Sequence, residues 1–73
     1  MNGEISPLDV VALLQDLPAA RLQRGQVGTV VETLAPGVYE VEFSDDEGRT
    51  YASLSVAASD LLPLVYTVAD AAR

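Results

Sequence analysis

The sequence predicts an all-β domain: a small closed or half-closed antiparallel barrel of five short strands, with a short 3₁₀ turn before the last strand. Stretches of β-branched, aromatic and apolar residues are separated by turn residues roughly every eight to twelve positions. Two of these stretches alternate between apolar and polar side chains, and none is long enough for a crossover helix. A chain of 73 residues forms one domain at most.

The first two strands are expected within residues 8–14 and 27–33. The first is a short apolar run that fits a strand buried on both faces, although its periodicity also permits a helix and an α+β domain. In the second, Gly28 predicts a bend or bulge because glycine weakens a plain strand. Ala-Pro-Gly at residues 35–37 then predicts a type II turn, in which Pro sets the first corner and Gly37 accepts a positive φ.

The third and fourth strands, residues 38–43 and 50–56, show the clearest alternation. A polar loop over residues 44–49 joins them into a hairpin. The side chains expected to point inward are those of Tyr39, Val41, Phe43, Ala52, Leu54 and Val56. Those expected on the outer face are Val38, Glu40, Glu42, Tyr51, Ser53 and Ser55.

The C-terminal part of the chain is expected to complete the barrel. Residues 59–62, a capping Ser59 followed by two leucines, predict a single helical or 3₁₀ turn before Pro63. Residues 64–67 are expected to form the fifth strand. The expected organisation is a flexible N-terminus of residues 1–6, a barrel of residues 7–67, and an alanine-rich tail of residues 68–73 that extends as a short helix or frays.

The composition excludes several classes of site. Cys and His are both absent, which removes disulfides and zinc, haem and iron–sulfur centres. The same absence removes thiol nucleophiles and imidazole bases, and without lysine there is no Schiff-base chemistry. We therefore expect a protein without cofactor or metal that is not an enzyme.

The charge balance restricts the class of partner. Four cationic residues against 11 acidic ones give a net charge of −7, so the surface repels the phosphates of nucleic acids and anionic lipids. The N-terminus does not resemble a secretory signal, and no apolar run approaches the roughly 20 residues that span a bilayer. A cytoplasmic protein that binds a basic protein, with neither nucleic acid nor membrane as its partner, is the expectation.

Five carboxylates lie within residues 40–47, and Glu32 is expected beside them on the neighbouring strand. They are either a solvated strand face and turn or an anionic surface that docks a cationic partner. A calcium loop beginning at Asp45 would need an acidic residue where Val56 stands, so that motif fails. Glu40 and Glu42 have the spacing of a glycosidase pair, but a chain of this size has little volume for the necessary cleft.

An outward Tyr51 next to carboxylates is a good interface anchor, whereas Tyr39 and Phe43 are expected in the core. The expected partner-binding residues are Glu40, Glu42, Asp45, Asp46, Glu47 and Tyr51. They suggest an inhibitor of immunity or antitoxin type, whose acidic face covers a cationic site such as the phosphate-binding groove of a nuclease. The alternative is a self-associating structural or accessory module, a homo-oligomer that pairs through its apolar strands.

Arg-Gly-Gln-Val-Gly-Thr-Val-Val at residues 24–31 resembles the start of a strand in SH3-like barrels, including the KOW module. Together with residues 7–13, 34–43 and 48–52, it also resembles an uncharacterised family of small bacterial proteins, domain of unknown function 4926. The resemblance implies an SH3-like frame and a bacterial source. It further implies a free-standing short protein, from a family with some genomic neighbourhoods that suggest toxin neutralisation. KOW modules bind RNA through basic surfaces, which the acidic composition here does not provide.

Overall fold

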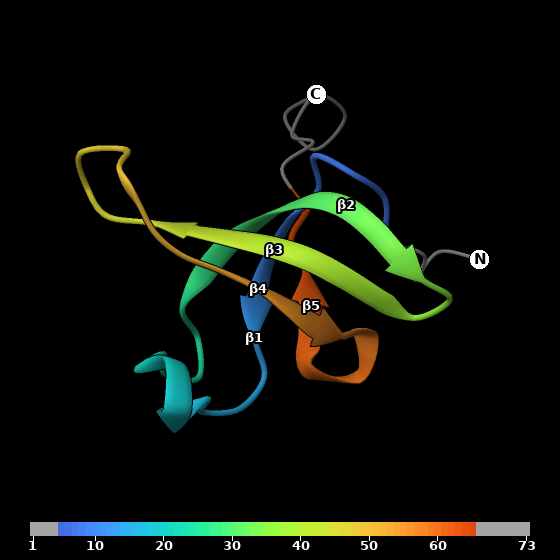
Figure 1. Ribbon diagram of the computed structural model, residues 1–73, viewed down its shortest axis with the longest axis horizontal. Helices are drawn as coiled ribbons and strands as arrows, with labels where there is room; N and C mark the ends of the chain where they lie inside the picture. Colours follow the sequence, from blue (N-terminus) through green and yellow to red (C-terminus); the bar gives the residue numbers. More distant parts are fainter. Residues whose placement is uncertain (1–4, 66–73) are drawn as a thin grey trace, which may run out of the picture.

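The computed structural model describes residues 5–65, so the expected C-terminal tail lies outside the described residues. It confirms an all-β fold of five antiparallel strands with a 3₁₀ turn before the last strand (Figure 1). The elements are β1 (Val10–Leu13), η1 (Pro18–Ala20), β2 (Val27–Ala35), β3 (Val38–Ser44), β4 (Thr50–Ala57), η2 (Ala58–Asp60) and β5 (Leu61–Pro63). Within residues 5–65 no helix could cross a membrane.

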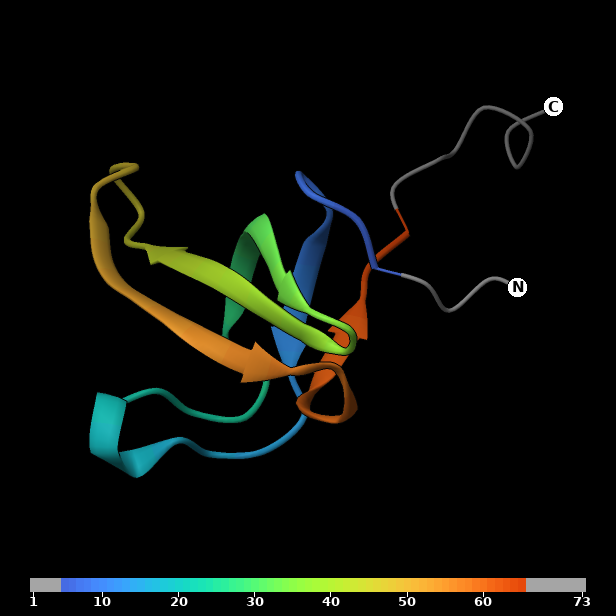
Figure 2. The ribbon, with the colours of Figure 1, turned by 45° about the vertical axis from the view of Figure 1, so that its right-hand side comes forward.

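The strands form one sheet in the order β4-β3-β2-β1-β5. Consecutive hairpins join β2, β3 and β4, whereas β1 lies between β2 and β5. Figures 1 and 2 show a curved sheet in which β1 and β5 cross the direction of β3 and β4. The two edge strands, β4 and β5, are not paired with each other in the described residues, so the predicted barrel is not closed.

Alternation along β3 and β4 separates the core from an outer face, as the sequence predicts. Tyr39, Val41 and Phe43 are buried, while Tyr51 on β4 is exposed. The first apolar segment is a strand and not a helix, and its core-facing side chains pack with those of β3. The core cluster consists of Ile5, Val11, Leu13, Leu22, Val30, Tyr39, Val41, Phe43, Val56 and Leu61.

The expectation of a bulge at Gly28 is wrong, because Gly28 pairs in regular register with both Val11 and Phe43. The register shifts of β2 lie between Val30 and Glu32 and again between Thr33 and Ala35. Gly28 instead permits a close approach, because a Cβ atom there would lie 2.8 Å from both the carbonyl oxygen of Glu42 and the Phe43 ring. The turn at Gly37 is confirmed, with a φ of 76°.

The 3₁₀ turn η2 and the strand β5 differ in their positions from the prediction. Ser59 lies inside η2, whose N-cap is Ala57, and no side chain caps it. The fifth strand is Leu61–Pro63, not residues 64–67, of which only 64 and 65 are described. Pro63 is accommodated because it lies on an edge strand, where one side of the backbone has no ladder partner. The structure also adds η1 in what the sequence indicates only as a polar loop.

The Gly28→Ala substitution tests the close approach of β2 and β3. The added methyl group would lie too close to both the Phe43 ring and the carbonyl oxygen of Glu42, so both contacts must be relieved. Overpacking of this kind lowers the free energy of unfolding by about 1–3 kcal/mol. Denaturant unfolding of Gly28→Ala, Phe43→Leu and the double variant measures it. The double variant is expected to be more stable than the sum of the single effects predicts, and strict additivity would contradict the contact.

Candidate functional site

The outer face of β2 and β3 carries three carboxylates, here called the acidic face: Glu32, Glu40 and Glu42. Glu32 lies directly opposite Glu40 in the β2–β3 register, whereas the sequence predicts only that it lies beside the acidic cluster. Glu42 follows two residues along β3, so its side chain points to the same face. The Ser53 hydroxyl on β4 donates a hydrogen bond of 2.6 Å to Oε2 of Glu40. Sheet register therefore fixes these carboxylates side by side.

The pairing of Glu32 with Glu40 is electrostatically unfavourable for the chain on its own. Like charges directly opposite each other in an antiparallel pair repel. In residues 5–65 the two ion pairs both belong to Arg49, and none reaches the acidic face. A cationic group of another molecule placed over Glu32 and Glu40 would relieve this repulsion.

The β3–β4 loop, residues 45–49, is held by Asp45. Oδ1 of Asp45 accepts the backbone N–H groups of Glu47 at 2.9 Å and Arg49 at 3.0 Å. The N–H of Asp45 in turn donates to the Arg49 carbonyl oxygen, and Gly48 takes a φ of 84°. The hydrogen bond from the backbone of Arg49 is the main cause that lowers the pKa of Asp45, and those from Glu47 and the Arg49 side chain add to it. Asp45 therefore has a structural role in the loop.

Arg49 partly neutralises the loop. Its Nε lies 3.1 Å from Oδ2 of Asp45, and its Nη2 lies 2.9 Å from Oε1 of Glu47. Asp46, which lies between these two residues in the chain, has no ion pair among residues 5–65. Of the three loop carboxylates, Asp46 is the one whose full charge is available to another molecule.

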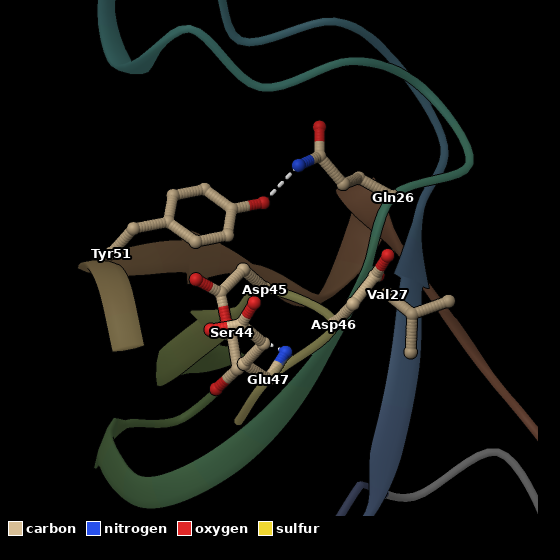
Figure 3. A pocket seen from close by; sticks show the side chains of 7 residues that line it. All are labelled: Gln26, Val27, Ser44, Asp45, Asp46, Glu47 and Tyr51. Carbon is tan, nitrogen blue, oxygen red and sulfur yellow. Dashed lines mark hydrogen bonds between the residues drawn. The ribbon is translucent and has the colours of Figure 1, made fainter. Parts of the chain in front are cut away.

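An open hollow of about 560 Å³ lies between this loop and the start of β2. Figure 3 shows its lining side chains, which are Gln26, Val27, Ser44, Asp45, Asp46, Glu47 and Tyr51. The Tyr51 hydroxyl accepts a hydrogen bond from Nε2 of Gln26 across the hollow. Gln26 is itself held, because its Oε1 accepts the backbone N–H of Gln23 at 2.8 Å. The tyrosine ring is thereby fixed at the side of the hollow while remaining 48% exposed.

The structure thus divides the six predicted site residues between two neighbouring surfaces. Asp45, Asp46, Glu47 and Tyr51 line the hollow, whereas Glu40 and Glu42 lie on the acidic face. Sequence reasoning missed Gln26, Val27 and Ser44. Val27 is the first residue of β2 and is 46% exposed, although it is apolar. No pattern indicated that the Gln26 amide reaches Tyr51 from 25 residues away in the chain.

The two surfaces have the chemistry of a site for cations carried on side chains. An exposed phenol ring with carboxylates beside it suits a guanidinium or ammonium group, which binds both the ring face and the acids. Within residues 5–65 no three acidic side chains are grouped in an arrangement that could hold a metal ion.

The pKa of Asp45 can be tested by following its carboxyl carbon in NMR titrations of the folded and urea-unfolded chain. The folded pKa is expected to lie below the unfolded one. A lowered folded pKa stabilises the fold above the unfolded pKa, and this stabilisation is lost as the pH falls through the folded pKa. Arg49→Ala should keep most of the lowering, because the backbone N–H remains. A return to the unfolded value in that variant would show that the side chain dominates.

The like-charge pair can be tested by Glu32→Lys. A lysine opposite Glu40 converts repulsion into attraction, which should raise the free energy of unfolding by about 0.2–1 kcal/mol at low salt. Glu32→Gln, which removes only the repulsion, should give a smaller increase. Denaturant unfolding at two salt concentrations measures both, and an effect that does not shrink with salt would contradict an electrostatic origin.

The chain was compared with known proteins by family, by sequence and by structure. Neither the curated proteins nor the solved structures gave a significant match. A family model, described as Domain of unknown function (DUF4926), matches residues 8–63, a span from the residues just before β1 to the end of β5. The chain therefore belongs to the DUF4926 family.

Proposed function

We propose that this chain is a non-enzymatic, acidic protein-binding module of the bacterial cytoplasm. It covers a basic site on a partner protein, in the manner of an immunity or antitoxin-type inhibitor. The observation that supports this most directly is the register of Glu32 opposite Glu40, with Glu42 beside them and no cation from residues 5–65 paired to any of them. A cationic partner would turn an unfavourable arrangement into a favourable one.

The net charge and the local surfaces act at different stages of this binding. A net charge of −7 attracts a basic partner from a distance and speeds encounter. The acidic face then orients the partner through its carboxylates, while Asp46 and the Tyr51 ring hold a Lys or Arg side chain in the hollow. A surface of this kind competes with phosphate groups for the same cationic groove on the partner.

A second candidate function, self-association, is supported by a different part of the outer face. Ala12 on β1 is flanked by Val27 and Leu62 across the ladder, and Leu14 lies just after the end of β1. These three larger side chains are between 45% and 48% exposed. Burial of such a strip against a second copy would remove apolar surface from water without involving the acidic face.

The proposal is tested by affinity capture from the native host with a double variant, Glu42→Gln with Asp46→Asn. Both substitutions keep the shape of the side chain and remove a charge that faces the partner. Loss of two interfacial charges should weaken binding about tenfold or more. The affinity of the recovered partner is measured by calorimetry at low and high salt, and it should fall as salt rises.

Asp9→Asn with Asp16→Asn is the matched control, since it gives the same net charge from outside both surfaces and keeps an oxygen that can accept the backbone N–H groups of Ser6 and Arg24. It should change the association rate but leave most of the affinity. Equal losses in the two double variants would show that only overall charge matters. Capture of no basic protein, or of one whose affinity is indifferent to salt, would overturn the proposal.

A further inference from the structure

β4 is an edge strand without the usual protection. It has eight residues, pairs only with β3 in residues 5–65, and contains neither proline nor a charged side chain. The opposite edge, β5, has three residues and ends in Pro63. Natural sheets shield their edges with short strands, prolines or charges, because an open edge offers backbone groups to another strand. β4 has one register shift near its start, where Tyr51 lies between the pairs that Thr50 and Ala52 make with β3. From Ala52 to Ala57 the strand is regular and has none of these devices.

The backbone groups that β4 offers can be identified from the ladder. The N–H of Val30 donates to the carbonyl oxygen of Asp9, on the β1 side, so its partner Val41 directs its own backbone groups to β4. The hydrogen bond from the N–H of Ala58 to the Gly37 carbonyl oxygen, farther along the β3–β4 ladder, agrees with this alternation. Antiparallel pairing alternates, so Leu54, which pairs with Val41, directs its N–H and C=O to β3. Ser53 and Ser55 therefore direct theirs to the open side.

An apolar groove of about 290 Å³ runs along the inner side of this edge. Residues 54–57 of β4 form one wall and η1 forms the other, with Leu17 and Asp60 completing the lining. Figure 2 shows η1 below β4. A strand added to β4 would direct every second side chain into this groove.

The outer side of the same edge is acidic. Ser53 and Ser55 are short, and they pair with Glu42 and Glu40 of β3 respectively. Neighbouring strands lie about 4.8 Å apart, so a long side chain on an added strand can pass over a serine and reach a β3 carboxylate. Lysine and arginine have the required length and charge.

We propose that the β4 edge binds an extended segment of a partner protein in which basic residues alternate with apolar ones. The apolar residues enter the groove beside η1, the basic residues cross Ser53 and Ser55 toward Glu40 and Glu42, and the backbone adds a sixth strand. This inference rests on the proposed function for its basic partner and adds the mode of binding. A second copy of the chain is disfavoured, because it carries the same net charge of −7 and would set acidic faces beside each other.

The probe is a seven-residue peptide of alternating lysine and valine, and the control peptide has the same side chains with its three central backbone nitrogens methylated. Binding is measured by calorimetry and by amide shifts of Ser53 and Ser55. Methylation and the Ser55→Pro substitution should each weaken binding about tenfold, since both remove backbone hydrogen bonds. Ser55→Ala, which keeps the N–H, should bind as well as the parent chain.

Ala19→Trp provides a second route that leaves β4 unchanged. Ala19 is exposed on η1, and a tryptophan there would fill the groove without entering the core. It should weaken the alternating peptide about tenfold, whereas Gln23→Trp, outside the groove, should not. This pair keeps the test valid if Ser55→Pro fails to fold.

The outcomes separate the two proposals. Binding that weakens with Glu40→Gln and Glu42→Gln but ignores methylation, Ser55→Pro and Ala19→Trp would overturn strand addition and leave the acidic module standing. Absence of binding by the unmethylated peptide at millimolar concentration would also overturn strand addition, while capture from the host still tests the module. Sedimentation that shows a dimer abolished by Ser55→Pro would assign the edge to a second copy and overturn the inference.

Discussion

The contact of the Phe43 ring with Gly28 determines how closely β2 and β3 approach. With no Cβ on Gly28, the ring lies over the backbone of the neighbouring strand and is completely buried. Val11 pairs with Gly28 from the other side, so one residue connects three strands of the sheet. A domain without cysteine has no disulfide to hold it and depends on packing of this kind.

The two faces of β3 carry opposite chemistry, and the strand register connects them. Tyr39, Val41 and Phe43 fix which residues point inward, and this leaves Glu40 and Glu42 on the outer face. The register shift between Val30 and Glu32 then brings Glu32 opposite Glu40, where a regular continuation from the Val30–Val41 pair would have placed Val31. The electrostatic character of the outer face is thus a consequence of how the core packs.

Alternation allowed the central hairpins and their faces to be predicted from the sequence. β3 and β4 show a period of two over six or more residues, and the Ala-Pro-Gly turn marks where β2 ends and β3 begins. The fifth strand was predicted from local pattern alone, and its position was wrong. Pro63 ends a strand and does not precede one, because its place on the sheet edge is set by pairing with Val11.

The same limit applies to the site. Four of the six predicted residues line one hollow because a short loop keeps residues near in sequence near in space. Gln26 comes from another part of the chain, and its contact with Tyr51 depends on the curvature of the whole sheet. The role of Gly28 also needs a residue distant in sequence, since its neighbour is the Phe43 ring.

The position of β1 between β2 and β5 affects the order in which the molecule can assemble. β2, β3 and β4 are joined by tight hairpins and can pair as soon as they have been synthesised. β1 leaves the ribosome before them, yet one of its neighbours is encoded near the far end of the matched region. Until β5 has been synthesised, the side of β1 (Val10–Leu13) that pairs with β5 has no partner. Neighbouring nascent chains on one messenger RNA can then associate through this apolar strand.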